Sequence, residues 1–209
     1  MDNSKPAPKF VFFDAGFTLL EPNPSVGFHY AELAREYSVN ASAEVLDRAF
    51  FVAWKAVRKN QPASIKVPYG VTDAESRGFW TQVVRECFAA AGGGVPQARE
   101  YYTRLYDRFA EARCWRLYPD VGEALGVVRA AGIPWGILSN WDARLRSVVA
   151  GFPELRDCAA LVISSEAGAE KPDPEIFRFA EEKCGLIAGQ LALLGDDPQA
   201  DGVGAQRAG

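Results

Sequence analysis

Apolar positions in the first half of the chain follow two patterns that predict different structures. Residues 10–13, Phe-Val-Phe-Phe, are apolar and β-favouring, and four residues are too few for a helix, so they predict a buried strand. Between residues 26 and 109, apolar side chains instead recur at helical spacing. A polar break over residues 59–70 interrupts this region, and Thr72 with Glu75 then has the spacing of a capping box. These segments predict a small helical bundle.

From Pro119 onward, strand-like and helix-like segments alternate. Short apolar strands separated by amphipathic helices are predicted at residues 134–138, 161–163 and 191–194. Asp173 followed by Pro174 is a start signal for one of the helices. Alternation of this kind predicts an α/β fold with a doubly wound parallel sheet.

The helical region interrupts the α/β pattern, and this predicts two domains. Residues 1–20 and 115–209 are expected to form a Rossmann-like α/β core. Residues 21–114 are expected to form an inserted α-helical bundle, here called the cap domain.

Composition narrows the classes of partner. Of the 209 residues, 48% are apolar and 24% are charged, which is ordinary for a globular protein. The net charge of −4 argues against nucleic acid or an anionic membrane surface as the main partner. No apolar run approaches the roughly 18 residues of a membrane-spanning helix. The first nine residues lack the apolar stretch of a secretion signal.

Cysteine and histidine usage bears on compartment and chemistry. The four cysteines form no C-x-x-C pair, which favours reduced thiols in a cytoplasmic protein over a disulfide framework or a zinc site. His29 is the single histidine and lies within a helical pattern. Any catalysis must therefore rest on carboxylates, lysine and hydroxyl groups.

Polar residues of these types follow the predicted strands. Because carboxyl ends of parallel strands meet at one edge of a sheet, they are expected to converge with a loop lysine. The residues are Asp14, Ser139, Asn140, Lys171, Asp196, Asp197 and Asp201. Carboxylates suit Mg²⁺, while a hydroxyl, an amide and a lysine suit a transferring phosphoryl group. Taken alone, Asp14 could equally be an aspartate that accepts hydrogen bonds from the backbone of its own turn. Together with the other residues of this set, it fits the role of a nucleophile that forms an aspartyl-phosphate.

Four short runs carry a family resemblance. They are Asp14–Leu20, Ile137–Asn140, Lys171–Pro174 with Ile176–Phe177, and Gly195–Asp197 with Asp201 and Gly204–Ala205. In this order and spacing, the chain resembles the haloacid dehalogenase-like (HAD-like) hydrolase superfamily, in the branch whose helical cap lies between the first two motifs. The resemblance covers essentially the whole chain. The run Ser139–Leu145, Ser-Asn-Trp-Asp-x-Arg-Leu, resembles one subgroup of phosphatase-like members.

The resemblance implies a set of metal ligands. Asp14 would be both the nucleophile and a ligand of Mg²⁺. The backbone carbonyl of Gly16 and the carboxylate of Asp196 would be further ligands. Asp197 or Asp201 would either coordinate the metal itself or hold in place a group that does.

The resemblance also implies how a phosphorylated substrate is held. Ser139 and Asn140 would bind the phosphoryl oxygens, and Lys171 would neutralise both Asp14 and the incoming phosphate. The cap domain would close over the site, exclude water and shape specificity. The implied function is a Mg²⁺-dependent phosphatase acting on a small phosphorylated metabolite.

One position departs from the family pattern. Phosphatases of this family carry a second aspartate two residues after the nucleophile as general acid and base, and here that position is Gly16, followed by Phe17 instead of glycine. General acid–base catalysis contributes about 10²–10⁴-fold, so slow hydrolysis of esters with poor leaving groups is expected. Two alternatives stay open: dehalogenation or phosphonate cleavage on the same nucleophile, and a catalytically weak binding or scaffold protein.

Overall fold

The computed structural model describes residues 7–62 and 64–209. Residues 1–6 of the predicted core, and residue 63 in the predicted break, lie outside the described residues. The chain divides into two compact units, Met1–Glu21 with Leu117–Gly209 and Pro22–Arg116. The function of the second unit as a cap stays a prediction.

The first unit contains a four-stranded sheet. Its strands are β1 (Phe10–Phe13), β4 (Trp135–Ser139), β5 (Ala160–Ile163) and β6 (Leu191–Leu194). They lie in the order β5-β4-β1-β6, and all neighbouring strands are parallel. The predicted α/β fold with a parallel sheet is confirmed.

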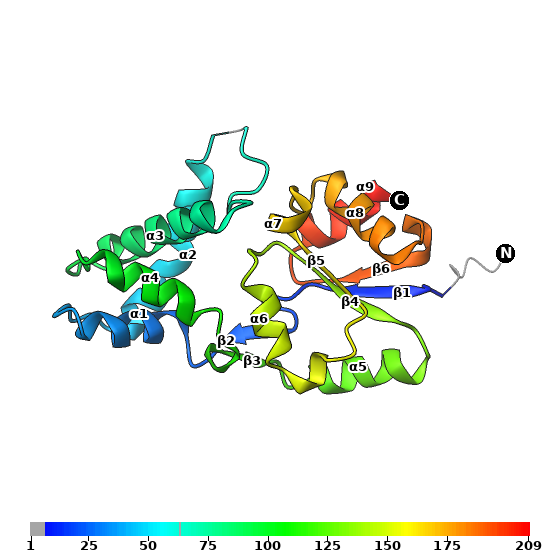
Figure 1. The fold of residues 1–209 in the computed structure, drawn as a ribbon, viewed down its shortest axis with the longest axis horizontal. Helices are drawn as coiled ribbons and strands as arrows, with labels where there is room; N and C mark the ends of the chain where they lie inside the picture. Colours follow the sequence, from blue (N-terminus) through cyan, green and yellow to red (C-terminus); the bar gives the residue numbers. More distant parts are fainter. Residues whose placement is uncertain (1–6, 63) are drawn as a thin grey trace. The chain divides into compact units, whose positions relative to one another are not determined.

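Helices cover both faces of this sheet because its strands are apolar on both faces. Phe10 and Phe12 of β1 pack in one buried cluster with Ile176 of α8 (Pro174–Cys184). Figure 1 shows α8 and α9 (Gly204–Ala208) on one side of the sheet and α5 (Val121–Ala130) on the other. The unit is completed by α6 (Leu145–Ala150) and α7 (Ser164–Ala167). The sheet is therefore doubly wound.

Strand register sets which polar residues share an edge. Phe13, the last residue of β1, pairs with Ile137 of β4 and with Leu194, the last residue of β6. The residues that directly follow β1 and β6 therefore emerge side by side. Ser139 ends β4 at the same carboxyl edge.

The second unit is helical, as the apolar spacing predicts. It contains α1 (Val26–Arg35), α2 (Ala43–Lys59), α3 (Asp73–Ala90) and α4 (Arg99–Arg108). The predicted capping box is present, because Thr72 accepts from the Glu75 backbone N–H at 3.2 Å and Glu75 accepts from the Thr72 backbone N–H at 3.0 Å. Tyr30, Phe88 and Tyr101 belong to its buried core.

One element was not predicted. Two strands of three residues each, β2 (Leu20–Pro22) and β3 (Trp115–Leu117), pair in a small second sheet. Both passages of the chain between the two units lie within these strands. Strands this short leave no periodic pattern. Within the described residues, none of the helices is long and apolar enough to span a bilayer.

Candidate active site

Asp14 is held at the carboxyl edge of the sheet by the loop that follows β1. Its backbone N–H donates to the Leu194 carbonyl at 2.8 Å. Its Oδ1 accepts from the backbone N–H of Ala15 at 2.8 Å. The backbone N–H groups of Leu19 and Leu20 donate to the Ala15 carbonyl at 2.9 and 2.8 Å, which closes the turn. The buried strand thus ends in a tight loop that presents a carboxylate.

Lys171 lies between two carboxylates and is almost completely buried. Its Nζ is 3.1 Å from Oδ1 of Asp14 and 2.5 Å from Oδ1 of Asp201. Burial raises the pKa of the Asp14 carboxyl above its usual value. The charge of Lys171 and a hydrogen bond from Ser139 oppose that shift, and so favour the ionised form that a nucleophile requires.

Ser139 and Asn140 act on different parts of the site. The Ser139 hydroxyl is buried against the Asp14 carboxylate, to which it donates. Asn140 Nδ2 donates to the Lys171 carbonyl at 2.9 Å, and the Lys171 backbone N–H donates to Asn140 Oδ1 at 2.7 Å. This reciprocal pair ties the loop after β4 to the loop that carries Lys171. The contact of Ser139 and Asn140 with a phosphoryl group stays a prediction.

Three carboxylates gather at this edge. Asp14, Asp196 and Asp201 each place one oxygen within 4.8 Å of the other two. Gly195 permits this arrangement, because a Cβ at that position would lie 2.1 Å from Oδ2 of Asp201. Thr18 Oγ1 donates to Asp196 Oδ1 at 3.4 Å. The set matches the oxygen ligands that Mg²⁺ prefers.

Asp197 lies outside that group, although the sequence nominates it together with Asp201. Its Oδ1 accepts from the backbone N–H groups of Gln199 and Ala200 at 2.8 and 3.0 Å. Its carboxylate therefore caps the helical turn Pro198–Val203, as N-cap aspartates do. The geometry favours Asp201 as the third carboxylate of the group. Coordination of a metal by the backbone carbonyl of Gly16 stays a prediction.

Formal charge tests whether a cation belongs here. The three carboxylates, offset by the single ammonium of Lys171, leave a formal charge of −2. An anionic substrate would be repelled by this site, whereas a divalent cation would bring its formal charge to zero. The donor set thus fits a hard divalent cation.

A family model for haloacid dehalogenase-like hydrolases matches residues 8–209. The chain belongs to this family. The chain is therefore a hydrolase, its relatives include a phosphoserine phosphatase, and the predicted membership of this superfamily is confirmed.

Individual relatives agree with this assignment. A haloacid dehalogenase-like hydrolase domain-containing protein 3 from Danio rerio is 30% identical over 190 residues, which cover 90% of this chain and 76% of the relative. A phosphoserine phosphatase from Thermus thermophilus is 31% identical and covers 96% and 86% of the two chains. The structure of L-2-haloacid dehalogenase from Xanthobacter autotrophicus shares the fold, with a TM-score of 0.66, 19% identity and coverage of 97% and 75%.

The HAD-like site contains residues that sequence reasoning did not assign. Trp141 follows Asn140, and its indole lies against Gly16. Asp142 is fully buried and forms an ion pair with Arg144, with 2.8 Å from Arg144 Nε to Asp142 Oδ1. The run Ser-Asn-Trp-Asp-x-Arg was visible in the sequence, but no spacing rule shows which way its side chains point.

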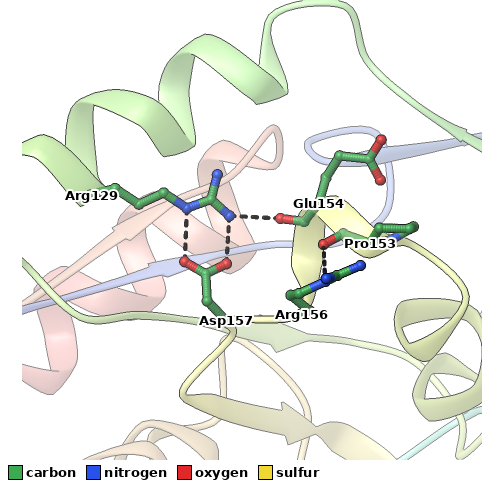
Figure 2. A pocket seen from close by; sticks show the side chains of 5 residues that line it. All are labelled: Arg129, Pro153, Glu154, Arg156 and Asp157. Atoms are coloured by element: carbon green, nitrogen blue, oxygen red, sulfur yellow. Dashed lines mark hydrogen bonds and ion pairs between the residues drawn. The ribbon is translucent and has the colours of Figure 1, made fainter.

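A pocket elsewhere in the HAD-like core is unrelated to these residues. Figure 2 shows it lined by Arg129, Pro153, Glu154, Arg156 and Asp157. Trp135 Nε1 donates to Asp157 Oδ2 at 3.2 Å, and Trp135 is the first residue of β4 whereas Ser139 is the last. The pocket therefore lies at the amino end of that strand, and Arg129 is occupied by the Asp157 carboxylate at 2.7 Å.

The two candidate acids can be separated by one matched pair of substitutions. Asp201→Asn is expected to weaken Mg²⁺ binding about 10- to 100-fold, the cost typical of disturbing a metal's coordination. Asp197→Asn is expected to leave Mg²⁺ affinity unchanged, because asparagine caps a helix as well as aspartate does. Calorimetric titration of both variants with Mg²⁺ measures the difference. The reverse order of affinities would assign the metal to Asp197.

Proposed function

We propose that this HAD-like hydrolase is a Mg²⁺-dependent phosphatase of the cytoplasm that acts on small phosphorylated metabolites through an aspartyl-phosphate on Asp14. The observation that carries the proposal is the grouping of the Asp14, Asp196 and Asp201 carboxylates, two of which, Asp14 and Asp201, also pair with Lys171. The phosphatase among its relatives supports the same reaction class.

The proposed reaction uses the chain's own residues in two steps. An oxygen of Asp14 attacks phosphorus, the bond from phosphorus to the leaving oxygen breaks, and the leaving group departs with the electron pair. Water then attacks the aspartyl-phosphate, releasing inorganic phosphate and regenerating the carboxylate. Lys171, 3.1 Å from Asp14, is placed to offset the negative charge that gathers in both steps.

Mg²⁺ would be held by Asp14, Asp196 and Asp201, and it would supply positive charge to the phosphoryl oxygens. Asp201 has a second task in the same arrangement. It is 4% exposed, and it holds Lys171 Nζ at 2.5 Å while accepting from the Asp197 backbone N–H at 3.0 Å. The lysine is thereby kept in position before any substrate arrives.

Gly16 sets the expected range of substrates. Glycine has no side chain to protonate the leaving oxygen, so esters whose leaving group is stable as an anion are expected to react best. Phenolic and acyl phosphates have such leaving groups, whereas alkyl phosphates do not.

Dehalogenation is the second candidate, and Gly16 is the observation in its favour. The dehalogenases of the family share the absence of a second aspartate. The three-carboxylate group speaks against it, because a 2-haloacid is an anion and the site without a cation has a formal charge of −2.

A panel of phosphate esters with and without Mg²⁺ tests the proposal. Phenyl phosphate is expected to be hydrolysed only with Mg²⁺, and methyl phosphate to react about 10²–10⁴-fold more slowly. Chelation followed by re-addition of Mg²⁺ is the control, and released phosphate is the measurement. Equal rates for both esters would contradict the leaving-group argument, and metal-independent halide release from a 2-haloacid would favour the dehalogenase.

A further inference from the structure

The indole of Trp141 lies beside the point at which a side chain of residue 16 would begin. A Cβ built on Gly16 would be 3.5 Å from Cζ3 and 4.0 Å from Cε3 of Trp141. These distances are ordinary van der Waals contacts, so the six-membered ring of the indole borders position 16. That position is two residues from Asp14, on the loop that carries the nucleophile. Trp141 as a whole is partly exposed.

Trp141 is fixed through its backbone. Its N–H donates to Ser164 Oγ at 3.0 Å, and Ser164 Oγ donates to its carbonyl at 3.0 Å. The backbone N–H of Ser165 donates to the same carbonyl at 3.2 Å. Three hydrogen bonds thus anchor the residue to the start of α7.

The residues on either side of Trp141 are also fixed. Asn140 is bound to the Lys171 backbone by the reciprocal pair described above. Asp142 is fully buried and accepts from the Arg144 backbone N–H at 3.1 Å and from its guanidinium. The backbone that carries the indole is therefore held by hydrogen bonds at residues 140, 141 and 142, which limits the entropy lost when a ligand packs against the indole.

We propose that Trp141 is a specificity-determining residue that packs against the leaving group and selects phosphate compounds with a flat aromatic leaving group. Aromatic rings attract one another beyond the area that they bury. An indole offers only an N–H donor and no group that gives up a proton at neutral pH. The indole can therefore pack against an aromatic ring but cannot protonate an alkoxide leaving group. The inference rests on the proposed phosphatase function and names its substrate class.

Gly16 and Trp141 then both favour aromatic over alkyl leaving groups. The glycine removes the acid that an alkyl ester needs, and it places no side chain of its own between the nucleophile loop and the indole atoms that border position 16. In the first chemical step, an Asp14 oxygen bonds to phosphorus while the aryl-bearing oxygen leaves with its electron pair. That oxygen takes any proton from water.

Acetyl phosphate and benzoyl phosphate separate ring recognition from leaving-group reactivity, because both release a carboxylate and only one has a ring. The wild type is expected to favour benzoyl phosphate about 2- to 12-fold in kcat/KM, the factor that an aromatic contact contributes. Trp141→Ala and Trp141→Leu are expected to lose this preference, which is measured as the ratio of the two kcat/KM values in each variant. Trp141→Phe should retain it.

Trp135→Phe is the matched control, because Trp135 lies at the other end of β4. It should keep the preference for benzoyl phosphate. Trp141→Leu keeps apolar volume without a ring, so it carries the test if the alanine variant does not fold. An unchanged preference in a folded Trp141→Leu protein would overturn the inference.

A binding experiment separates this inference from the proposed function. Calorimetry with phenylphosphonate and methylphosphonate, neither of which has a cleavable ester, should show tighter binding of the phenyl compound to the wild type but not to Trp141→Leu. If neither acyl phosphate is turned over and this difference persists, the phosphatase proposal fails and Trp141 still selects an aromatic ligand. Equal affinities in the wild type would overturn the inference even if the phosphatase proposal holds.

Discussion

Replacing Asp14 by alanine is expected to lower the rate of phenyl phosphate hydrolysis by about 10⁴-fold or more, the scale on which enzymes lose activity when their nucleophile is removed. Without the carboxylate there is no oxygen to form the aspartyl-phosphate. Lys171 keeps its 2.5 Å partner Asp201 in this variant, so the fold is expected to persist. Steady-state phosphate release, with circular dichroism as the test of folding, measures the effect.

Asp120→Ala provides the control for loss of one acidic side chain. Asp120 is exposed at the start of α5 and makes no side-chain capping hydrogen bond, so its removal should leave the rate unchanged. Turnover that survives in Asp14→Ala at the wild-type level would rule out an aspartyl-phosphate on this residue. Trapping of a phosphorylated Asp14 by rapid acid quench gives an independent check.

The second large effect is a gain in the rate of alkyl phosphate hydrolysis. Gly16→Asp is expected to raise the rate on methyl phosphate by about 10²–10⁴-fold, because it places a carboxyl group where a general acid can reach the leaving oxygen. The site has room for the change. Position 16 lacks the left-handed backbone that only glycine tolerates well, and a Cβ there would meet Trp141 at 3.5 Å.

Gly16→Asn is the matched control for this gain. It has nearly the same shape as the aspartate variant but cannot donate or accept the proton. It should leave methyl phosphate as slow as in the wild type. If both variants gained equally, the effect would come from altered loop geometry and not from proton transfer. Phenyl phosphate should gain from neither change, and it should lose at most the roughly 2- to 12-fold effect of the Trp141 contact that a side chain at position 16 would obstruct.

The strand ends of the site could be predicted because they follow from periodicity. A run of four apolar residues before Asp14, and of similar length before Ser139 and Asp196, implies parallel strands whose carboxyl ends meet. The observed register then brings Asp14 beside the residues that follow Leu194. For these residues, the sequence pattern and the sheet topology together nearly determine where each one lies along the carboxyl edge of the sheet.

Loop residues could not be placed by the same reasoning. Lys171 lies 30 positions before Asp201 and follows no strand, so periodicity could not place it. Its chemistry and the family resemblance were the grounds for grouping it with Asp14. Asp197 and Asp201 have the same chemistry and differ by one helical turn. Backbone hydrogen bonds decide between them, because they direct the Asp197 carboxylate to Gln199 and Ala200. Trp141 was recognised as part of a motif, but its contact with position 16 depends on loop conformation.

Positions 195 and 201 compete for one volume, and this constrains how the enzyme can be redesigned. Because a Cβ at position 195 would come within 2.1 Å of the Asp201 carboxylate, variation at one site restricts what the other accepts. A mutagenesis library that diversifies the loop after β6 one residue at a time would discard solutions that need both changes. Selections for new substrates should therefore hold the glycine constant or vary the two positions as a pair.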